Sequence, residues 1–358
     1  MHVLVIAEQL RRAAPGGIGT YVRSLVAAVE GEPEITLLAS RAPAGGDPVA
    51  ALGRPVVTSP LPGKLLTRAW GRGLAGVGGS RFDLVFAPSL AAPPCRSVPV
   101  AVAVHDVAWR RLPEAYPARG RRWHDRALAR AARTAALLIV PSPETADEVV
   151  AAGAPASRVE VLDPMYGCDH LPPADGEGRV AALARLGVTG PYLLAVGTLE
   201  PRKNLSRLVE AYTRARPFLP DPWPLVLVGP AGWGVEVDAL RRVDGVKVAG
   251  PVSGAVLASL YAGAVCVAYV PLFEGYGLPA VEAMAAGVPL VASPVPSTAG
   301  TALEVDPLDV DAIAAGLVTA ASDDRRRAEL VTGGLLRASE LTWKAAADRH
   351  VEAWRAVA

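Results

Sequence analysis

The chain has 358 residues, of which 51% are hydrophobic and 20% are charged, and its formal net charge at pH 7 is +1. This length favours two domains, each large enough for its own core. The near-zero net charge offers no electrostatic argument for binding nucleic acid, so we expect no nucleic-acid partner. Three cysteines without a C-x-x-C spacing predict neither a disulfide framework nor a zinc site.

The first residues enter a strand-like run, Val-Leu-Val-Ile at 3–6, and show no arrangement typical of a secretory signal. No uninterrupted apolar run reaches the length of a membrane span. With the scattered cysteines, these features predict a cytoplasmic protein.

Short apolar, β-branched runs alternate along the chain with Ala-, Leu- and Arg-rich segments of helical character. Such alternation is typical of parallel, doubly wound α/β sheets. A proline- and glycine-rich stretch breaks the rhythm between Gly167 and Gly190. We therefore predict two Rossmann-like domains facing across a cleft, followed by a terminal helix; their ranges are 1–170, 171–340 and 341–358. The expected strands are 3–7, 35–39, 84–87, 100–104, 137–140 and 159–162, then 192–196, 225–229, 246–249, 264–269, 290–292 and 302–305.

A glycine-rich loop, Pro-Gly-Gly-Ile-Gly-Thr-Tyr at 15–21, follows the first predicted strand. Glycines such as Gly17 let the backbone approach a phosphate or sugar at a helix start. A plain loop is an equally good interpretation. The spacing is not G-x-G-x-x-G, which argues against a nicotinamide-dependent oxidoreductase.

His105 closes another predicted strand and is followed by Asp106. A histidine at the carboxyl end of a strand can hydrogen-bond a hydroxyl or orient an acceptor. A structural role is the alternative, but the chain has only five histidines, so the position favours function.

The stretch 119–133 is locally basic, and a helix would align its arginines on one side. A solvated helical face is the favoured interpretation. The alternative is a face that meets anionic lipid or a lipid-diphosphate acceptor, and any membrane contact of this kind would be peripheral. The arginines are Arg119, Arg122, Arg126, Arg130 and Arg133.

A basic motif, Gly-Thr-Leu-Glu-Pro-Arg-Lys-Asn at 197–204, follows a strand of the second domain. Arg202 and Lys203 are suited to neutralise a diphosphate leaving group. The alternative is a solvated turn before a helix capped by Asn204. Lysine is rare in this arginine-rich chain, with Lys203 one of only four, which favours the functional interpretation.

The most informative motif spans 273–284, Phe-Glu-Gly-Tyr-Gly-Leu-Pro-Ala-Val-Glu-Ala-Met. The motif follows a predicted strand. It contains, in this order along the chain, Glu274, a glycine turn, a helix that begins near a proline, and Glu282. Backbone N–H groups of the turn and helix start favour an anion, while the flanking carboxylates accept bonds from hydroxyls. A diphosphate between two hydroxylated rings is a sugar nucleotide, so we predict such a site. The alternative is a loop acid and a helix acid that complements the dipole.

Metal dependence would require a pattern such as Asp-x-Asp, and Asp309-Val310-Asp311 is one match. It is better interpreted as a helix N-terminus. We therefore predict no metal and no cofactor.

Together these motifs resemble the retaining, nucleotide-sugar-dependent glycosyltransferases of the GT-B fold, group 1 or family 4, and most of all their bacterial mannosyl- and glucosyl-transferring members. The resemblance covers nearly the whole chain. It implies that Glu274 contacts donor-sugar hydroxyls and Glu282 the ribose hydroxyls. It also implies that Gly17 approaches the diphosphate and that His105 lies beside the transferred sugar. The remaining donor-binding set is Arg202, Lys203, Gly197, Thr198, Tyr276, Gly277 and Leu278.

The resemblance further implies hexose transfer with retention of configuration and without a metal. GDP-mannose is the leading donor, and the acceptor is a hydroxyl of a glycan, a lipid-linked saccharide or a small metabolite. A nucleotide-sugar epimerase or hydrolase, which needs no acceptor, and a non-catalytic sugar-nucleotide-binding subunit are the alternatives.

Two departures from the family pattern stand out. Thr198 occupies a position where many members carry arginine, which shifts the phosphate contacts toward Arg202 and Lys203. The segment 293–300 is shorter than usual and lacks the expected proline-glutamate pair, so its loop contacts should differ.

Overall fold

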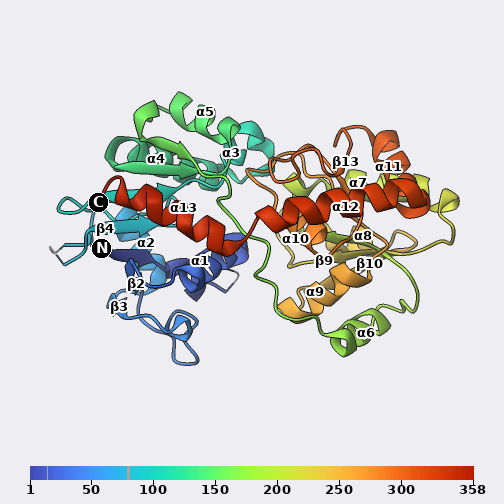
Figure 1. Ribbon diagram of the computed structural model, residues 1–358, viewed down its shortest axis with the longest axis horizontal. Helices are drawn as coiled ribbons and strands as arrows, with labels where there is room; N and C mark the ends of the chain where they lie inside the picture. Colours follow the sequence, from blue (N-terminus) through green and yellow to red (C-terminus); the bar gives the residue numbers. More distant parts are fainter. Residues whose placement is uncertain (14, 79–80) are drawn as a thin grey trace. The chain divides into compact units, whose positions relative to one another are not determined.

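The computed structural model describes residues 1–13, 15–78 and 81–358 and is shown in Figure 1. The chain divides into two compact units. One comprises Met1–His170 with Thr342–Ala358, and the other comprises Leu171–Leu341. Each is built on one fully parallel sheet with helices packed against it. The predicted fold class, two Rossmann-like α/β domains, is confirmed.

The first unit has a seven-stranded sheet in the order β3-β2-β1-β4-β5-β6-β7. Its strands β4 and β5 are buried throughout, as expected for apolar strands covered on both faces. The strands are β1 (His2–Ile6), β2 (Glu34–Ala39), β3 (Val56–Thr58), β4 (Leu84–Ala87), β5 (Val100–Ala103), β6 (Leu137–Val140) and β7 (Val159–Val161).

The helices of the first unit include the last helix of the chain, α13, which packs against α1. Trp343, His350 and Trp354 of α13 are buried there, and the Tyr21 hydroxyl of α1 donates to His350 Nε2 at 2.5 Å. The helices are α1 (Gly16–Ala28), α2 (Gly63–Gly71), α3 (Ala108–Arg111), α4 (Ala118–Thr134), α5 (Pro143–Ala151) and α13 (Trp343–Arg355).

The second unit has a six-stranded sheet in the order β10-β9-β8-β11-β12-β13. Its strands are β8 (Leu193–Val196), β9 (Leu225–Val228), β10 (Val246–Gly250), β11 (Cys266–Tyr269), β12 (Leu290–Ala292) and β13 (Leu303–Glu304). Its helices are α6 (Gly176–Ala184), α7 (Leu205–Ala215), α8 (Val237–Arg241), α9 (Gly254–Gly263), α10 (Leu278–Ala285), α11 (Val310–Ser322) and α12 (Asp324–Glu340).

The short strand β3 was not predicted, because Val56-Val57-Thr58 is too brief to stand out as an apolar run. Asp309 caps α11, since its carboxylate accepts from the backbone N–H groups of Asp311 and Ala312, as the helix interpretation predicted. Across the described residues, no helix is both long and apolar enough to cross a membrane.

Candidate active site

The strand order of the second unit reverses between β8 and β11, which lie side by side at its centre. In parallel sheets the carboxyl ends at such a reversal flank a crevice that binds ligands. The chain leaves β8 into the basic motif and leaves β11 into the acidic turn. Among the bonds that join these segments, Leu272 N donates to Arg202 O at 2.9 Å, and Asn204 Nδ2 donates to Val270 O at 3.1 Å. The fold therefore brings together two motifs separated by about seventy residues of sequence.

Asn204 tests one of the two interpretations of the basic motif, namely a solvated turn before a helix that Asn204 caps. It stands before α7 in a left-handed conformation, φ 60°, and its side chain makes no capping bond to the helix. Its amide instead donates to Val270 O and, at 2.7 Å, to Pro307 O. The interpretation of Asn204 as a helix cap is therefore wrong, because its side chain fastens neighbouring loops.

A glycine contact supports the basic motif from the β9 side. Gly229 has φ +145°, and a Cβ there would lie 2.0 Å from Gly197 O. The next residues run beside the motif, with Leu199 N donating to Pro230 O at 2.9 Å. Only glycine fits at position 229, and this close approach fixes the backbone of Gly197 and Thr198.

Arg202, Lys203 and Glu274 form one ion-paired cluster at the strand reversal. Arg202 Nη1 lies 2.6 Å from Glu274 Oε1, and its Nη2 lies 2.9 Å from Glu200 Oε1. Lys203 Nζ bonds the same Glu274 oxygen and donates to the Tyr269 hydroxyl at 3.2 Å. The side chains of the three are only 11–13% exposed, so the ion pairs are strengthened by partial exclusion of water.

The cations of the cluster keep the Glu274 carboxyl group ionised. Burial alone would raise the Glu274 pKa, but the adjacent Arg202 and Lys203 charges outweigh it and lower the pKa from 4.5 to about 2. Burial, and then the Glu274 charge, raises the pKa of Tyr269 well above its ordinary value. At neutral pH the cluster thus holds a carboxylate, two cations and a neutral phenol.

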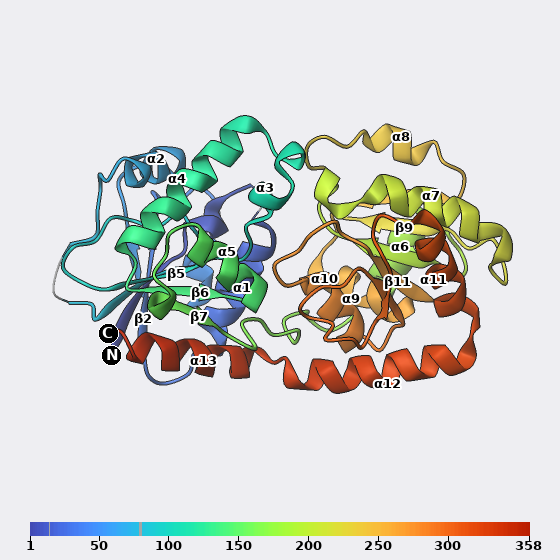
Figure 2. The same cartoon turned by 90° about the horizontal axis from the view of Figure 1, so that it is seen from above.

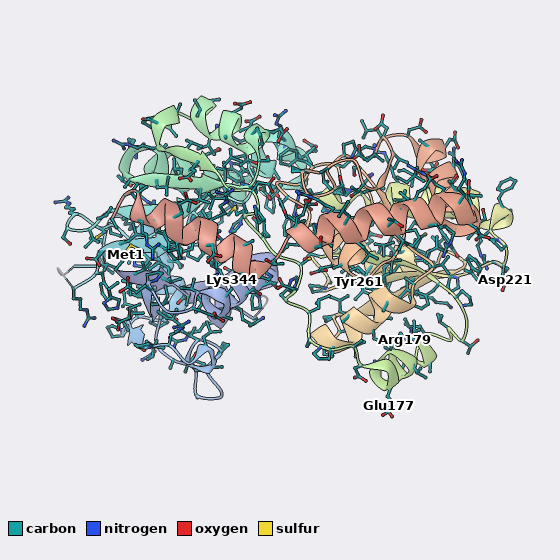
Figure 3. The ribbon with its side chains drawn as sticks, in the orientation of Figure 1. Met1, Glu177, Arg179, Asp221, Tyr261 and Lys344 are labelled. Carbon is teal, nitrogen blue, oxygen red and sulfur yellow. The ribbon has the colours of Figure 1, made fainter. Side chains whose placement is uncertain are left out.

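Glu282 lies on α10, where it is 8% exposed. The hydroxyl of Tyr261, which belongs to α9 and is labelled in Figure 3, donates to Glu282 Oε2 at 2.7 Å. Burial, together with the Glu282 charge, raises the Tyr261 pKa well above its ordinary value. Tyr261 therefore stays protonated and orients the Glu282 carboxylate.

The segment that follows β12 contacts the glycine turn before α10. Gly277 has φ +105°, precedes the first helical residue Leu278, and leaves that end of the helix without a side-chain cap. A Cβ on Gly277 would lie 2.9 Å from Ser297 Oγ, and Ser297 N donates to the carbonyl of the buried Tyr276 at 3.2 Å. The short segment 293–300 thus supports the turn.

His105 follows β5 in the first unit, and both of its ring nitrogens are engaged. Nε2 donates to Pro88 O at 2.7 Å, because a carbonyl only accepts, and Nδ1 accepts from the Tyr166 hydroxyl at 2.5 Å. Burial lowers the His105 pKa, so the ring is neutral. A contact from the ring to a substrate hydroxyl would have to replace one of these bonds.

Gly17 lies exposed in the first turn of α1. Two positions further on, Gly19 is buried, and a Cβ there would lie 2.3 Å from Pro15 Cβ. The two glycines therefore differ: Gly19 is packed against Pro15, whereas Gly17 is exposed.

Tyr261, Tyr269 and Ser297 contact the predicted site residues but were missed by the sequence analysis. Tyr269 ends a predicted strand, which was a usable signal. Tyr261 lies on α9, and Ser297 lies in the loop after β12. No spacing along the chain indicates that these residues contact the site.

Two parallel α/β sheets, one of them with a basic motif and an acidic turn at its strand reversal, agree with the glycosyltransferase class that the sequence motifs indicated. Residues 15–165 match the family described as Glycosyltransferase Family 4, and residues 190–323 match Glycosyl transferases group 1. The O-antigen chain mannosyltransferase B of Escherichia coli is 32% identical over 268 residues, covering 70% of this chain and 68% of that relative. The chain belongs to this family of group 1 and family 4 glycosyltransferases.

A second curated relative is covered by this chain to a smaller share of its length. The D-inositol 3-phosphate glycosyltransferase of Kineococcus radiotolerans is 34% identical over 254 residues, which are 59% of this chain and 58% of the relative. Among solved structures, Anabaena HepE with UDP and glucose has a TM-score of 0.73 at 18% identity, covering 99% of this chain and 100% of that one. Sucrose-phosphate synthase from Thermosynechococcus elongatus has a TM-score of 0.74 at 19% identity, covering 99% and 98%. These likenesses establish the fold.

Proposed function

We propose that the chain is a retaining, metal-independent hexosyltransferase that transfers mannose from GDP-mannose to a hydroxyl of a glycan, a lipid-linked saccharide or a small metabolite in the cytoplasm. The observation that carries the proposal is the Arg202–Glu274–Lys203 cluster at the strand reversal. The mannosyltransferase relative supports the choice of sugar. HepE, solved with UDP-glucose, supports a nucleotide-sugar donor and makes UDP the main nucleotide that competes with GDP in this proposal.

The cluster is suited to bind a diphosphate and a sugar at once. An ammonium group has three N–H donors, and Lys203 uses two of them on Glu274 and Tyr269. The third is available for a phosphate oxygen, while Glu274 keeps the ammonium group in place. The second oxygen of Glu274 then accepts from a hydroxyl of the donor sugar.

The other predicted residues complete the donor site in this proposal. Glu282, oriented by Tyr261, accepts from the ribose hydroxyls. As the resemblance implies, His105 contacts the transferred sugar and Gly17 the diphosphate. Backbone groups of Gly197, Thr198, Tyr276, Gly277 and Leu278 bind the phosphates, where the uncapped start of α10 favours an anion.

Transfer then proceeds on one face of the sugar. The bond from the anomeric carbon to the diphosphate oxygen breaks as negative charge grows on the diphosphate, which Arg202 and Lys203 stabilise. The acceptor oxygen bonds to the same carbon from the same face, and its proton passes to the departing phosphate oxygen. Configuration is retained, and no protein base is consumed. The Asp309 carboxylate caps a helix, which supports a reaction without a metal bound there.

The first experiment measures the melting temperature of the protein with GDP, UDP, dTDP and ADP. A ligand at 100 times its Kd stabilises the fold by about 2.7 kcal/mol, so GDP should raise the Tm clearly. Glu282→Ala should abolish this rise. Glu329→Ala should preserve it, because this acid on α12 pairs with the neighbouring Arg325 and Arg326 of the same helix.

A rise with UDP alone would overturn the choice of base, and no rise with any nucleotide would overturn the donor site. Incubation with GDP-mannose and a set of hydroxyl acceptors, followed by NMR of the product, tests the reaction. A free sugar or an epimerised donor without glycosylated product would favour the hydrolase or epimerase, and binding without turnover would favour the non-catalytic subunit. Activity that is lost with EDTA and restored by a divalent metal would contradict metal independence.

A further inference from the structure

A basic groove runs between α2 and α4 of the first unit, which lie next to each other in Figure 2. Its volume is about 810 Å³. Arg130 of α4 links the two sides, since its Nη1 donates to Gly71 O at 3.5 Å. The residues lining it are Lys64, Thr67, Arg68, Gly71, Arg72, Arg119, Arg122, Trp123, Arg126, Ala127 and Arg130.

The groove is positively charged, and no acidic side chain among its described lining residues neutralises this charge. Seven of its eleven described lining residues are lysine or arginine, and none is acidic. The single acid of α4, Asp125, is engaged elsewhere, accepting from Trp109 Nε1 at 3.0 Å and from Arg110 Nε at 3.1 Å. Like charges that line one groove repel one another, so a bound anion would relieve a cost that the folded chain carries.

The basic side chains come from two helices and form lines. On α4 they stand at Arg119, Arg122, Arg126 and Arg130, a span of eleven residues or roughly 16 Å. Lys64, Arg68 and Arg72 repeat the four-residue spacing along and just beyond α2. Such lines are longer than one diphosphate, but they match an array of separate phosphate groups.

An aromatic side chain lies among the charges. Trp123 lines the groove and is 40% exposed, which is unusual for so large an apolar group. Arginine and lysine beside an exposed tryptophan is the combination found where a protein meets the headgroup layer of a membrane.

We propose that the α2–α4 groove is a docking surface for an anionic membrane. In this arrangement headgroup phosphates bind between the two lines of basic side chains, and Trp123 enters the interfacial layer. The proposal goes beyond the transfer reaction and does not depend on the identity of the donor. It adds Lys64, Arg68 and Arg72, which the sequence analysis did not connect with the arginines of α4.

Vesicle binding of the full chain tests the proposal. We compare co-sedimentation with vesicles of phosphatidylcholine alone and with an equimolar mixture of phosphatidylcholine and phosphatidylglycerol. Binding should require the anionic lipid and should disappear at about 1 M salt, where the Debye length shrinks to about 3 Å.

The variant Arg68→Gln/Arg122→Gln/Arg126→Gln should bind anionic vesicles about a hundredfold more weakly, roughly fivefold for each charge removed near the surface. The matched control is Arg241→Gln/Arg325→Gln/Arg349→Gln, which removes the same total charge at exposed positions outside the groove. It should bind nearly as well as the parent chain. Trp123→Ala should weaken binding less than the triple variant but make the remaining binding more sensitive to salt.

Equal losses in the two triple variants would overturn the proposal, because they would reflect net charge alone. Equal binding to both vesicle types would overturn it as well. A Tm rise with inorganic pyrophosphate that the groove variant loses, without any vesicle binding, would assign the groove to soluble phosphate esters instead. Melting curves of the groove variant verify that it is folded, and Arg122→Gln alone serves if the triple variant is not.

Discussion

Two regions of this glycosyltransferase concentrate positive charge, and they do so in opposite ways. At the strand reversal of the second unit, Arg202 and Lys203 are nearly buried and share the carboxylate of Glu274. In the α2–α4 groove, seven basic residues line one surface with no acid among the described lining residues. A cation held by a carboxylate has a fixed position, which catalysis at a defined atom requires. A cation without such a partner keeps its full attraction for an outside anion but not a fixed geometry.

The largest effect should follow from removing the shared carboxylate. Glu274→Gln leaves Arg202 and Lys203 repelling each other in a partly buried place, so we expect kcat to fall by at least about 100-fold. Stability should drop by on the order of 2 kcal/mol, or a Tm decrease of roughly 5 °C. Steady-state kinetics and thermal melting measure the two effects. Unchanged kcat would show that the cations do not need the carboxylate to fix them.

A direct comparison of one cation from each region should give the next largest contrast. Lys203→Met keeps the apolar stem but removes the charge, and should lower kcat with a soluble acceptor by about 100-fold. Arg126→Met should change that kcat by less than about twofold and slightly raise the Tm, because it relieves repulsion in the groove. Similar losses in both variants would contradict the distinction between the two regions.

The pH dependence of stability offers a more graded test. The pKa of Glu274 is lowered from 4.5 to about 2 in the folded protein. A lowered pKa contributes stability that is complete above the unfolded value and is lost as the pH falls through the folded one. The Tm difference between the parent chain and Glu274→Gln should therefore be constant from pH 7 to about 5 and shrink toward pH 2. A difference that changed mainly between pH 6 and 8 would contradict the assignment to Glu274.

The smallest effect concerns a carboxylate outside both regions. Asp309→Ala removes the cap of α11 and should cost about 1 kcal/mol, a Tm decrease of roughly 3 °C, with unchanged kcat. Calorimetry and a standard activity assay are sufficient. A loss of activity that EDTA reproduces in the parent chain would instead identify Asp309 as a metal ligand.

The sequence predicted the parts of this fold that depend on local pattern. Apolar runs marked all the strands except the very short β3, and glycines and prolines marked the turn before α10. The order of the strands was not predictable, because it depends on pairing between distant segments. Consequently the sequence suggested that Arg202 and Glu274 both serve the donor, but not that they contact each other.

The same limit applies to His105. Its position at the end of β5 was readable, but its bonds to Pro88 and Tyr166 come from segments 17 and 61 residues away along the chain. The prediction assumed a ring free to meet a hydroxyl, whereas the fold already uses both nitrogens. A substrate role for His105 remains a prediction.

The first unit is discontinuous along the chain, since it needs residues 342–358 as well as 1–170. Buried Trp343, His350 and Trp354 are the last of its core to be synthesised, and Tyr21 is separated from its histidine partner by 329 positions of the chain. The second unit, an uninterrupted segment, can fold while its neighbour is still incomplete. Before α13 is synthesised, the apolar surface of the first unit that these side chains cover has no partner, so we expect a chain that lacks residues 342–358 to aggregate more readily than the full chain.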